Sequence, residues 1–138
     1  HFDKIILPLD VVCGKEVDAD TLVNTRLVNE IEEFEMGLDV GPETIALFNE
    51  YLNKSKTVIW NGPVGVFEID KFAKGTRSIA DALTNLNATT IIGGGDTAAA
   101  VIGMGYKDAY THISTGGGAS LAMLEGVPLP GIESVDDR

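Results

Sequence analysis

Short runs of consecutive apolar residues alternate along this chain with segments whose apolar residues lie three or four positions apart. Residues 5–12 and 57–60 are such runs, and two more end at glycine triplets, at residues 93–95 and 116–118. Apolar runs of this length without polar alternation are typical of strands buried on both faces of a parallel sheet. We therefore predict four strands, the first of them a buried parallel strand over residues 5–12.

The segments between these strands have the spacing of amphipathic helices. Ile45, Phe48 and Leu52 fall on one helical face, and Pro42 stands at the helix start, where proline is best tolerated. The same reasoning predicts three further helices, which cover residues 71–87, residues 96 to about 103 or 105, and residues 119–124.

Two segments have a less decisive pattern. Residues 21–31 fit a helix or an irregular strand equally well, so both alternatives stay open, and residues 37–41 form a short apolar element between glycines. Across the whole chain, strands alternate with helices. This order predicts an α/β protein in which helices cover a parallel sheet.

The predicted strands end in polar, glycine-rich sequence, at residues 61–63, 93–96 and 114–118. In an open parallel sheet, ligands bind at the carboxyl ends of the strands. Consecutive glycines let backbone N–H groups approach a ligand, and the start of the following helix offers further unpaired donors. Two such strand ends on neighbouring units predict a site for one extended polyanion, such as a nucleotide.

Asp96 follows the first triplet directly. It could simply cap the next helix. A carboxylate beside bound phosphates is unfavourable, however, unless Mg²⁺ lies between them, so a magnesium–nucleotide site is the alternative interpretation. Thr97 could donate its hydroxyl to the same phosphates, and Glu68 could accept hydrogen bonds from a ribose.

The composition limits the possible partners. The chain has 138 residues, of which 44% are hydrophobic and 22% charged, and a formal net charge of −11. Nucleic-acid-binding proteins cluster Lys and Arg, so this acidic chain is not expected to bind nucleic acid. Any bound phosphate must instead be held by backbone amides, a helix end and a metal ion.

Three further features concern the cellular setting. No apolar run approaches the ~18 residues that a membrane span needs. The single cysteine, Cys13, permits no internal disulfide, suits a cytoplasmic protein and is interpreted as a small buried residue. The chain opens at His1 directly before a predicted strand, so we expect it to be part of a longer protein.

Other glycine-containing motifs are absent from this chain or only loosely matched. The Walker pattern G-x-x-x-x-G-K-[ST] and the hydrolase pattern G-x-S-x-G are both absent. Gly93, Gly95 and Ala98 satisfy the loose dinucleotide fingerprint, for which Asp108 is the best candidate acidic partner. A dinucleotide-binding module therefore remains an alternative on the pattern alone.

Three long motifs together resemble the phosphoglycerate kinase family. They are WNGPVGVFE at 60–68, GGGDT at 93–97 and HISTGGGAS at 112–120. Residues 7–12, 37–42 and 124–131 match that family as well, so the resemblance covers almost the whole chain. The chain departs from many members at Glu35, where they have Trp.

The resemblance implies the fold and the site. The chain would be the later half of a Rossmann-like three-layer domain with helices on both faces of its parallel sheet. Asp96 would hold the Mg²⁺-nucleotide, and Gly95, Gly117 and Gly118 would present amides to the transferred phosphoryl group. The implied nucleotide-binding residues are Gly37 and Leu38 for the adenine, Asn61 and Glu68 for the ribose, Gly94, Gly95 and Thr97 for the phosphates, and Pro63.

The resemblance also implies the activity, which is transfer of a phosphoryl group between 1,3-bisphosphoglycerate and MgADP to give 3-phosphoglycerate and MgATP in glycolysis. Residues 1–138 would be part of the C-terminal nucleotide-binding domain. The N-terminal substrate domain and the early part of this domain would be missing. We therefore expect the chain to be inactive alone.

Two other hypotheses stay beside this one, a non-catalytic fragment that keeps the fold and the dinucleotide-binding module. We expect the parent enzyme to be a monomer. The isolated chain is expected to self-associate through an exposed sheet edge.

Overall fold

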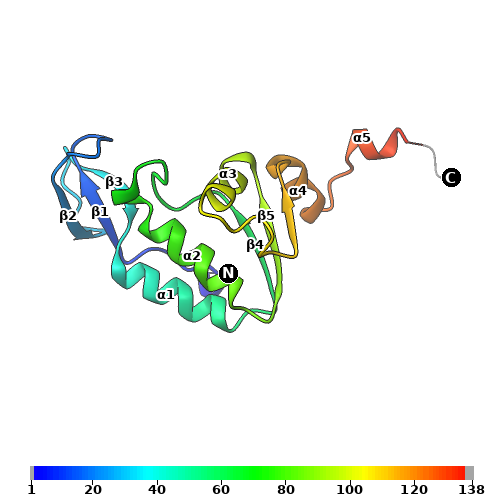
Figure 1. Ribbon diagram of the computed structural model, residues 1–138, viewed down its shortest axis with the longest axis horizontal. Coiled ribbons are helices and arrows are strands. Elements are labelled where there is room, and N and C mark those ends of the chain that lie inside the picture. The colour runs from blue at the N-terminus through cyan, green and yellow to red at the C-terminus, as the bar shows by residue number, and fades with distance from the viewer. Residues whose placement is uncertain (1, 136–138) are drawn as a thin grey trace.

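The structure, a computed structural model, describes residues 2–135 and contains two three-stranded sheets (Figure 1). The strands are β1 (Asp10–Gly14), β2 (Val23–Leu27), β3 (Met36–Val40), β4 (Thr57–Asn61), β5 (Thr89–Gly93) and β6 (His112–Ser114). The helices are α1 (Pro42–Asn53), α2 (Lys74–Thr84), α3 (Gly95–Gly103), α4 (Gly117–Leu124) and α5 (Pro130–Glu133), with 3-10 turns at Phe2–Lys4 and Asp70–Phe72.

The second sheet confirms the predicted α/β fold class. Its strand order is β4-β5-β6, and both pairs are parallel, with Ile59 opposite Ile91 and Ile92 opposite Ile113. One face of this sheet carries the main core, in which Trp60 of β4 and Ile92 of β5 pack against α2 and α3. The buried members of that core are Trp60, Ile79, Ala80, Leu83, Ile92 and Val101.

The opposite face of the parallel sheet is less covered. Because neighbouring residues of a strand point to opposite faces, Ile59 and Ile91 lie on this side. Together with Met123 and Leu124 of α4 they line a cavity of about 530 Å³. Helices therefore lie on both sides of the sheet, but among the described residues α4 covers only part of the second face.

The prediction of a buried parallel strand over residues 5–12 was wrong. The strand in this region is β1, which pairs antiparallel with both β2 and β3, and residues 5–9 form no strand. Instead of joining a ladder, the backbone N–H groups of Leu9 and Asp10 donate to the hydroxyl of Thr44. Leu7 is 68% exposed, so the apolar run is not buried as its composition indicated.

The antiparallel sheet also decides the segment that the sequence left open. Residues 23–27 form β2, so the strand alternative for residues 21–31 was right and the helix alternative wrong. Residues 36–40 form β3 on the other side of β1. The ambiguous apolar spacing of residues 21–31 reflects a strand that pairs on one side only and stays largely exposed.

Two helices join the two sheets. Helices α1 and α2 pack against each other, while α1 contacts β1 and α2 contacts β3 (Figure 1).

None of the helices in the described part of the chain is both long and apolar enough to cross a membrane.

Helix α1 starts with a cap from a distant strand. It has no side-chain cap of its own, and the Asp10 carboxylate of β1 accepts hydrogen bonds from the N–H groups of Glu43 at 3.2 Å and Thr44 at 2.7 Å. The Thr44 hydroxyl donates to the carbonyl oxygen of Asp10. Asp10 thus satisfies the orphan donors at this helix start and fixes α1 against the antiparallel sheet.

Candidate functional site

The carboxyl ends of the three parallel strands meet at one edge of the sheet, where α3 and α4 begin (Figure 1). The N–H of Gly94 donates to the carbonyl oxygen of Ser114 at 3.0 Å and ties the end of β5 to the end of β6. The strand ends that the sequence singled out are therefore brought together as expected.

The two glycine triplets approach each other at Gly94 and Gly117. A Cβ atom added at Gly117 would lie 2.9 Å from the Cα of Gly94 and 3.3 Å from the Oδ1 of Asn61. A Cβ at Gly94 would lie 2.7 Å from the same Asn61 oxygen, and Gly94 has a φ of +91°, which side-chain-bearing residues rarely adopt. These two glycines are needed for packing between the loops.

Gly95 and Gly118 have the opposite surroundings. Both are exposed, and a Cβ added at either would meet no atom within 4 Å. They lie in the first turns of α3 and α4, whose N–H groups have no acceptor within their helix. These are the triplet positions whose backbone a phosphate could approach from solvent.

Asp96 is exposed in the first turn of α3. Within residues 2–135, no three His, Cys, Asp or Glu side chains lie close enough to hold a metal ion together. Mg²⁺ in nucleotide sites is often held by one or two carboxylates, with phosphates and water completing its octahedron. A single open carboxylate beside the Gly95 amide fits this kind of site, and Asp96 is the side chain that would hold the ion.

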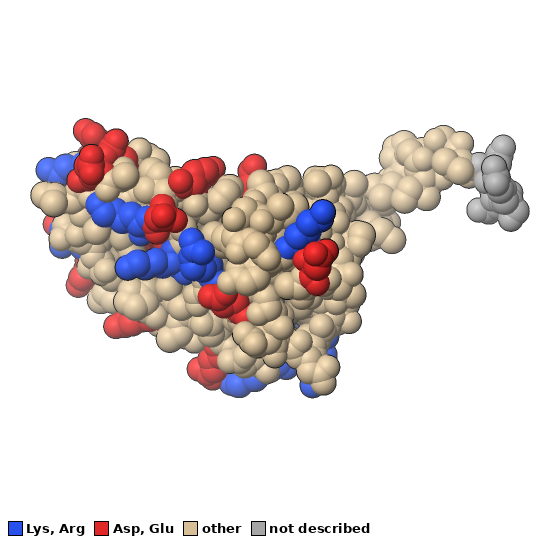
Figure 2. Space-filling model, viewed as in Figure 1, with Lys and Arg blue, Asp and Glu red and all other residues tan. Residues whose placement is uncertain are grey.

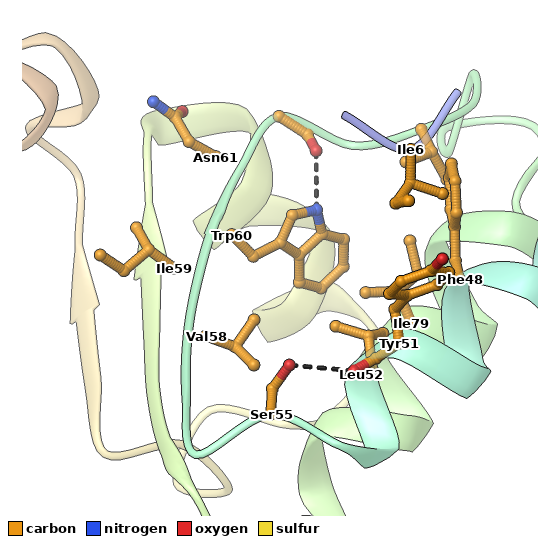
Figure 3. A pocket seen from close by; sticks show the side chains of 12 residues that line it. Ile6, Phe48, Tyr51, Leu52, Ser55, Val58, Ile59, Trp60, Asn61 and Ile79 are labelled. Atoms are coloured by element: carbon orange, nitrogen blue, oxygen red, sulfur yellow. Dashed lines mark hydrogen bonds between the residues drawn. The ribbon is translucent and has the colours of Figure 1, made fainter. Parts of the chain in front are cut away.

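Thr97 does not face solvent. Its side chain is fully buried, and its hydroxyl oxygen accepts a hydrogen bond from the N–H of Gly62 at 2.7 Å. The carbonyl oxygen of Gly62 accepts a second bond, at 2.7 Å, from the ring N–H of Trp60 (Figure 3). The expected contact between the Thr97 hydroxyl and a phosphate stays a prediction, since in this structure the hydroxyl is bonded to the turn after β4.

The turn after β4 also reaches β3. The N–H of Val66 donates to the carbonyl oxygen of Leu38 at 2.9 Å, and Gly65 lies against the side chain of Asp39. Gly37 is exposed, Leu38 is buried and Pro63 is half-buried. Leu38, one of the two residues expected to contact the adenine, is thus bonded to the segment that follows Asn61 and Pro63.

Glu68 follows the turn after β4 and lies near α3. It is exposed and lines a hollow of about 230 Å³ with Asp70, Arg77 and the α3 residues Ala99 and Gly103. Its predicted role at the ribose stays a prediction.

Asp39 is a buried charged residue that sequence reasoning missed. It is 3% exposed, and its carboxylate accepts hydrogen bonds from the N–H of Val40 at 2.8 Å and from that of Gly75, in the first turn of α2, at 2.9 Å. Burial raises the pKa of Asp39 above its usual value, and these hydrogen bonds offset only part of the rise. The available signal was an acidic residue inside an apolar element between Gly37 and Gly41.

Glu35 stands at the position where the resemblance noted from the sequence leads us to expect Trp. Its side chain is 4% exposed and pairs with Arg26 of β2, whose Nε lies 3.0 Å from one carboxylate oxygen. The hydrogen bond from Arg26 lowers the pKa of Glu35. Arg26 of β2 and Glu35, the residue directly before β3, thus form an ion pair at this departure from the family pattern.

A cavity beside Trp60 and the turn after β4 is lined mainly by apolar residues. Trp60 borders a hollow of about 400 Å³ that is lined from α1 by Phe48, Tyr51 and Leu52 (Figure 3). In the view of Figure 2, Lys and Arg are interspersed with Asp and Glu and form no continuous basic stripe. That backbone donors hold a bound phosphate at this edge of the sheet stays a prediction.

The dinucleotide alternative loses its acidic partner in the structure. Asp108 lies in the turn between α3 and β6, whereas the fingerprint requires an acidic residue that follows the next strand.

Cys13 is fully buried, as predicted, and its pKa is raised by burial.

Comparison with known proteins gives consistent matches. The family model described as phosphoglycerate kinase matches residues 1–127. Phosphoglycerate kinases of Listeria welshimeri and Enterococcus faecalis are each 54% identical over 137 residues, which are 99% of this chain but only 35% and 34% of those proteins.

Two solved structures share the fold. A phosphoglycerate kinase from Coxiella burnetii matches with a TM-score of 0.86 and 40% identity over 93% of this chain and 33% of its own. One from Pyrococcus horikoshii matches with a TM-score of 0.80 and 29% identity over 96% of this chain and 32% of its own. The chain spans about a third of the length of the relatives it matches.

Proposed function

The chain belongs to the phosphoglycerate kinase family, and we propose that it forms the part of that enzyme's site which holds a magnesium–nucleotide. The whole protein would transfer a phosphoryl group between 1,3-bisphosphoglycerate and MgADP, giving 3-phosphoglycerate and MgATP. Residues 1–138 would belong to a C-terminal nucleotide-binding domain, and an N-terminal domain would bind the phosphoglycerate.

One observation carries this proposal. Gly94 and Gly117 bring the starts of α3 and α4 together, while Gly95 and Gly118 leave the backbone of both helix starts open. Phosphoryl transfer needs mainly positioning and charge stabilisation, because the transferred group requires little covalent help. Two adjacent helix starts supply donors of the right kind at one edge of the sheet.

Each group in the proposed site has a limited role. A helix start contributes typically ~0.3–1 kcal/mol toward an anion, and up to ~2 kcal/mol when partly buried. Asp96 would hold Mg²⁺, which when bound neutralises phosphate charge. Gly95, Gly117 and Gly118 would direct N–H groups at the phosphates, and Gly37, Leu38, Asn61, Pro63 and Glu68 would orient the nucleoside. These contributions do not amount to catalysis, so we expect the isolated chain to bind nucleotide weakly and to have no kinase activity.

A titration of the 138-residue chain with MgADP tests this proposal. Trp60 is the only tryptophan and its ring N–H is bonded to Gly62, so its fluorescence reports on the turn that carries Asn61. We expect a saturable signal that needs Mg²⁺ and that Asp96→Asn abolishes. Asp108→Asn, which removes the same charge from the turn between α3 and β6, is the matched control and should leave the signal intact.

The other hypotheses predict different outcomes. A non-catalytic fragment would fold and show no saturable response to MgADP, and a dinucleotide-binding module would respond to NADH instead. Turnover by the isolated chain at the rate of a complete enzyme would contradict the expected inactivity.

We also propose a setting and an assembly. A protein of this activity would act in the cytoplasm, where a lone thiol such as that of Cys13 stays reduced. Among the described residues, β4 pairs on one side only, and its free edge is where two copies of the chain would associate. Sedimentation of the isolated chain as a strict monomer at high concentration would contradict this association, while the whole enzyme is expected to be monomeric.

A further inference from the structure

Both backbone polar groups of Gly62 are bonded to side chains of other elements. Its N–H donates to the Thr97 hydroxyl oxygen of α3, and its carbonyl oxygen accepts from the Trp60 ring N–H of β4, each at 2.7 Å. Gly62 has a φ of +101°, and a Cβ there would meet no atom within 4 Å. The position is glycine because of its backbone conformation, and the two side chains fix that conformation.

The Thr97 side chain is placed to hold this turn. It is 0% exposed, whereas its neighbours Gly95 and Asp96 are exposed at the same helix start. A ligand that approaches the open amides from solvent therefore meets Asp96 and the backbone of α3, with the Thr97 hydroxyl behind them. That hydroxyl already accepts a hydrogen bond from Gly62.

The bonded turn determines where Asn61 lies. Asn61 directly precedes Gly62, and its Oδ1 is the nearest atom to a Cβ added at Gly94, at 2.7 Å, and lies 3.3 Å from one added at Gly117. A shift of the Gly62 backbone would move Asn61 out of the junction between the two triplets. The Asn61 side chain thus lies between the starts of α3 and α4.

We infer that Thr97 is a positioning residue, whose hydroxyl fixes Gly62 and thereby Asn61 at the junction of the two glycine triplets and does not itself contact the nucleotide. This inference rests on the proposed function for its consequence in binding, since a displaced Asn61 would weaken MgADP affinity. Its structural half concerns the chain without ligand and is tested separately.

The first measurement uses the ligand-free chain. Hydrogen exchange of the Gly62 amide, followed by NMR, is compared in the unaltered chain, Thr97→Val and Thr97→Ser. Valine keeps the shape of threonine and removes the acceptor, so Gly62 should exchange roughly tenfold faster, as expected for loss of one hydrogen bond. Serine restores the oxygen and should restore slow exchange. Thr84→Val, which removes a hydroxyl bonded to Asp81 at the end of α2, is the control and should leave Gly62 unchanged.

The second measurement is MgADP affinity in the same variants. A positioning role predicts that Thr97→Val weakens binding several-fold, that Thr97→Ser recovers it, and that the exchange of Gly62 changes in parallel. If Thr97 were instead a phosphate ligand, Thr97→Val would weaken binding while Gly62 exchange in the free chain stayed as in the unaltered protein. That result, or unaltered affinity with a freely exchanging Gly62, would overturn the inference.

Two further outcomes are separable. If the unaltered chain bound no nucleotide, the proposed function of the chain would be wrong, and the role of Thr97 in fixing the turn would still be decided by Gly62 exchange. If Thr97→Val did not fold, Trp60→Phe would replace it. That change removes the other bond to Gly62 and should also accelerate Gly62 exchange, and slow exchange in it would contradict a turn held by these two side chains.

Discussion

The carboxylate of Asp39 accepts a hydrogen bond from the backbone N–H of Gly75 at 2.9 Å and so joins β3 to the start of α2. Helix α2 has no side-chain cap from its own sequence. A Cβ at Gly75 would lie 2.5 Å from the Asp39 Oδ1, and one at Gly65 would lie 2.4 Å from it. One buried acid thus caps a helix and packs against the turn of the proposed nucleotide site.

We predict that Asp39→Asn destabilises the chain by about 1–3 kcal/mol. Each carboxylate oxygen of Asp39 accepts a hydrogen bond from a backbone N–H, of Val40 or of Gly75. The NH₂ group of asparagine would replace one of these oxygens and leave one of the two N–H groups without its acceptor. Urea unfolding measures this loss. Glu43→Gln, on the exposed start of α1, is a control of the same chemical change and is expected to cost less than about 0.5 kcal/mol. An equal loss in both variants would contradict a special role for Asp39.

The stability difference between the unaltered chain and Asp39→Asn should depend on pH in a defined direction. Burial raises the pKa of Asp39 in the folded chain above its unfolded value of ~3.9, so the unfolded chain loses this proton first as pH rises. The stability of the unaltered chain relative to Asp39→Asn should therefore fall between ~3.9 and the raised pKa and be constant on either side. Urea titrations of both chains across this range measure the difference. A difference that grows with pH would be the wrong sign.

Asp10 should show the opposite dependence. Burial alone would raise its pKa, but the hydrogen bonds from Thr44 and from the N–H of Glu43 outweigh burial and lower it. Its stabilising contribution is present above ~3.9 and is lost as pH falls through the lowered pKa. The stability difference between the unaltered chain and Asp10→Ala should therefore shrink in acid. A difference independent of pH below ~3.9 would contradict ionised capping of α1.

The two glycines next to each other in the first triplet should respond differently to alanine. Gly94→Ala combines a positive φ with a Cβ 2.7 Å from Asn61 and should destabilise the chain by about 1–3 kcal/mol. Gly95→Ala has free space and lies in a helix, so stability should be unchanged or slightly higher. In MgADP titrations, however, the added methyl of Gly95→Ala should obstruct the phosphate and weaken binding. Thermal unfolding and titration of both variants separate packing from ligand approach.

Cys13 provides a probe of unfolding. It is fully buried in β1, and burial raises the pKa of its thiol, so both access and thiolate formation are suppressed in the folded chain. A thiol reagent should react with it only after the antiparallel sheet opens. Fast labelling under native conditions, at the rate of the urea-unfolded chain, would show that β1 is not stably held.

The parallel half of the chain was predictable because its signals are local. Residues 57–60 are β-branched or aromatic, and the glycine triplets stand where strands must end and helices begin, so the strand ends could be placed on one edge from topology rules alone. The pairing partners of β1 could not be predicted from local sequence. An apolar run does not say which neighbours it pairs with, and in the structure Thr44 takes the N–H groups of Leu9 and Asp10.

The sequence by itself determined that the chain is α/β, that glycine-rich strand ends converge, and that it resembles phosphoglycerate kinase, because these depend on residue type and order. Only the tertiary structure distinguished the glycines needed for packing, Gly94 and Gly117, from the open ones, Gly95 and Gly118. Only the tertiary structure, likewise, turned the Thr97 hydroxyl toward Gly62. The physical reason is that the role of a glycine or a hydroxyl depends on which distant residues pack against it or bond to it. Here these are Asn61 and the turn after β4, and the fold alone brings them close.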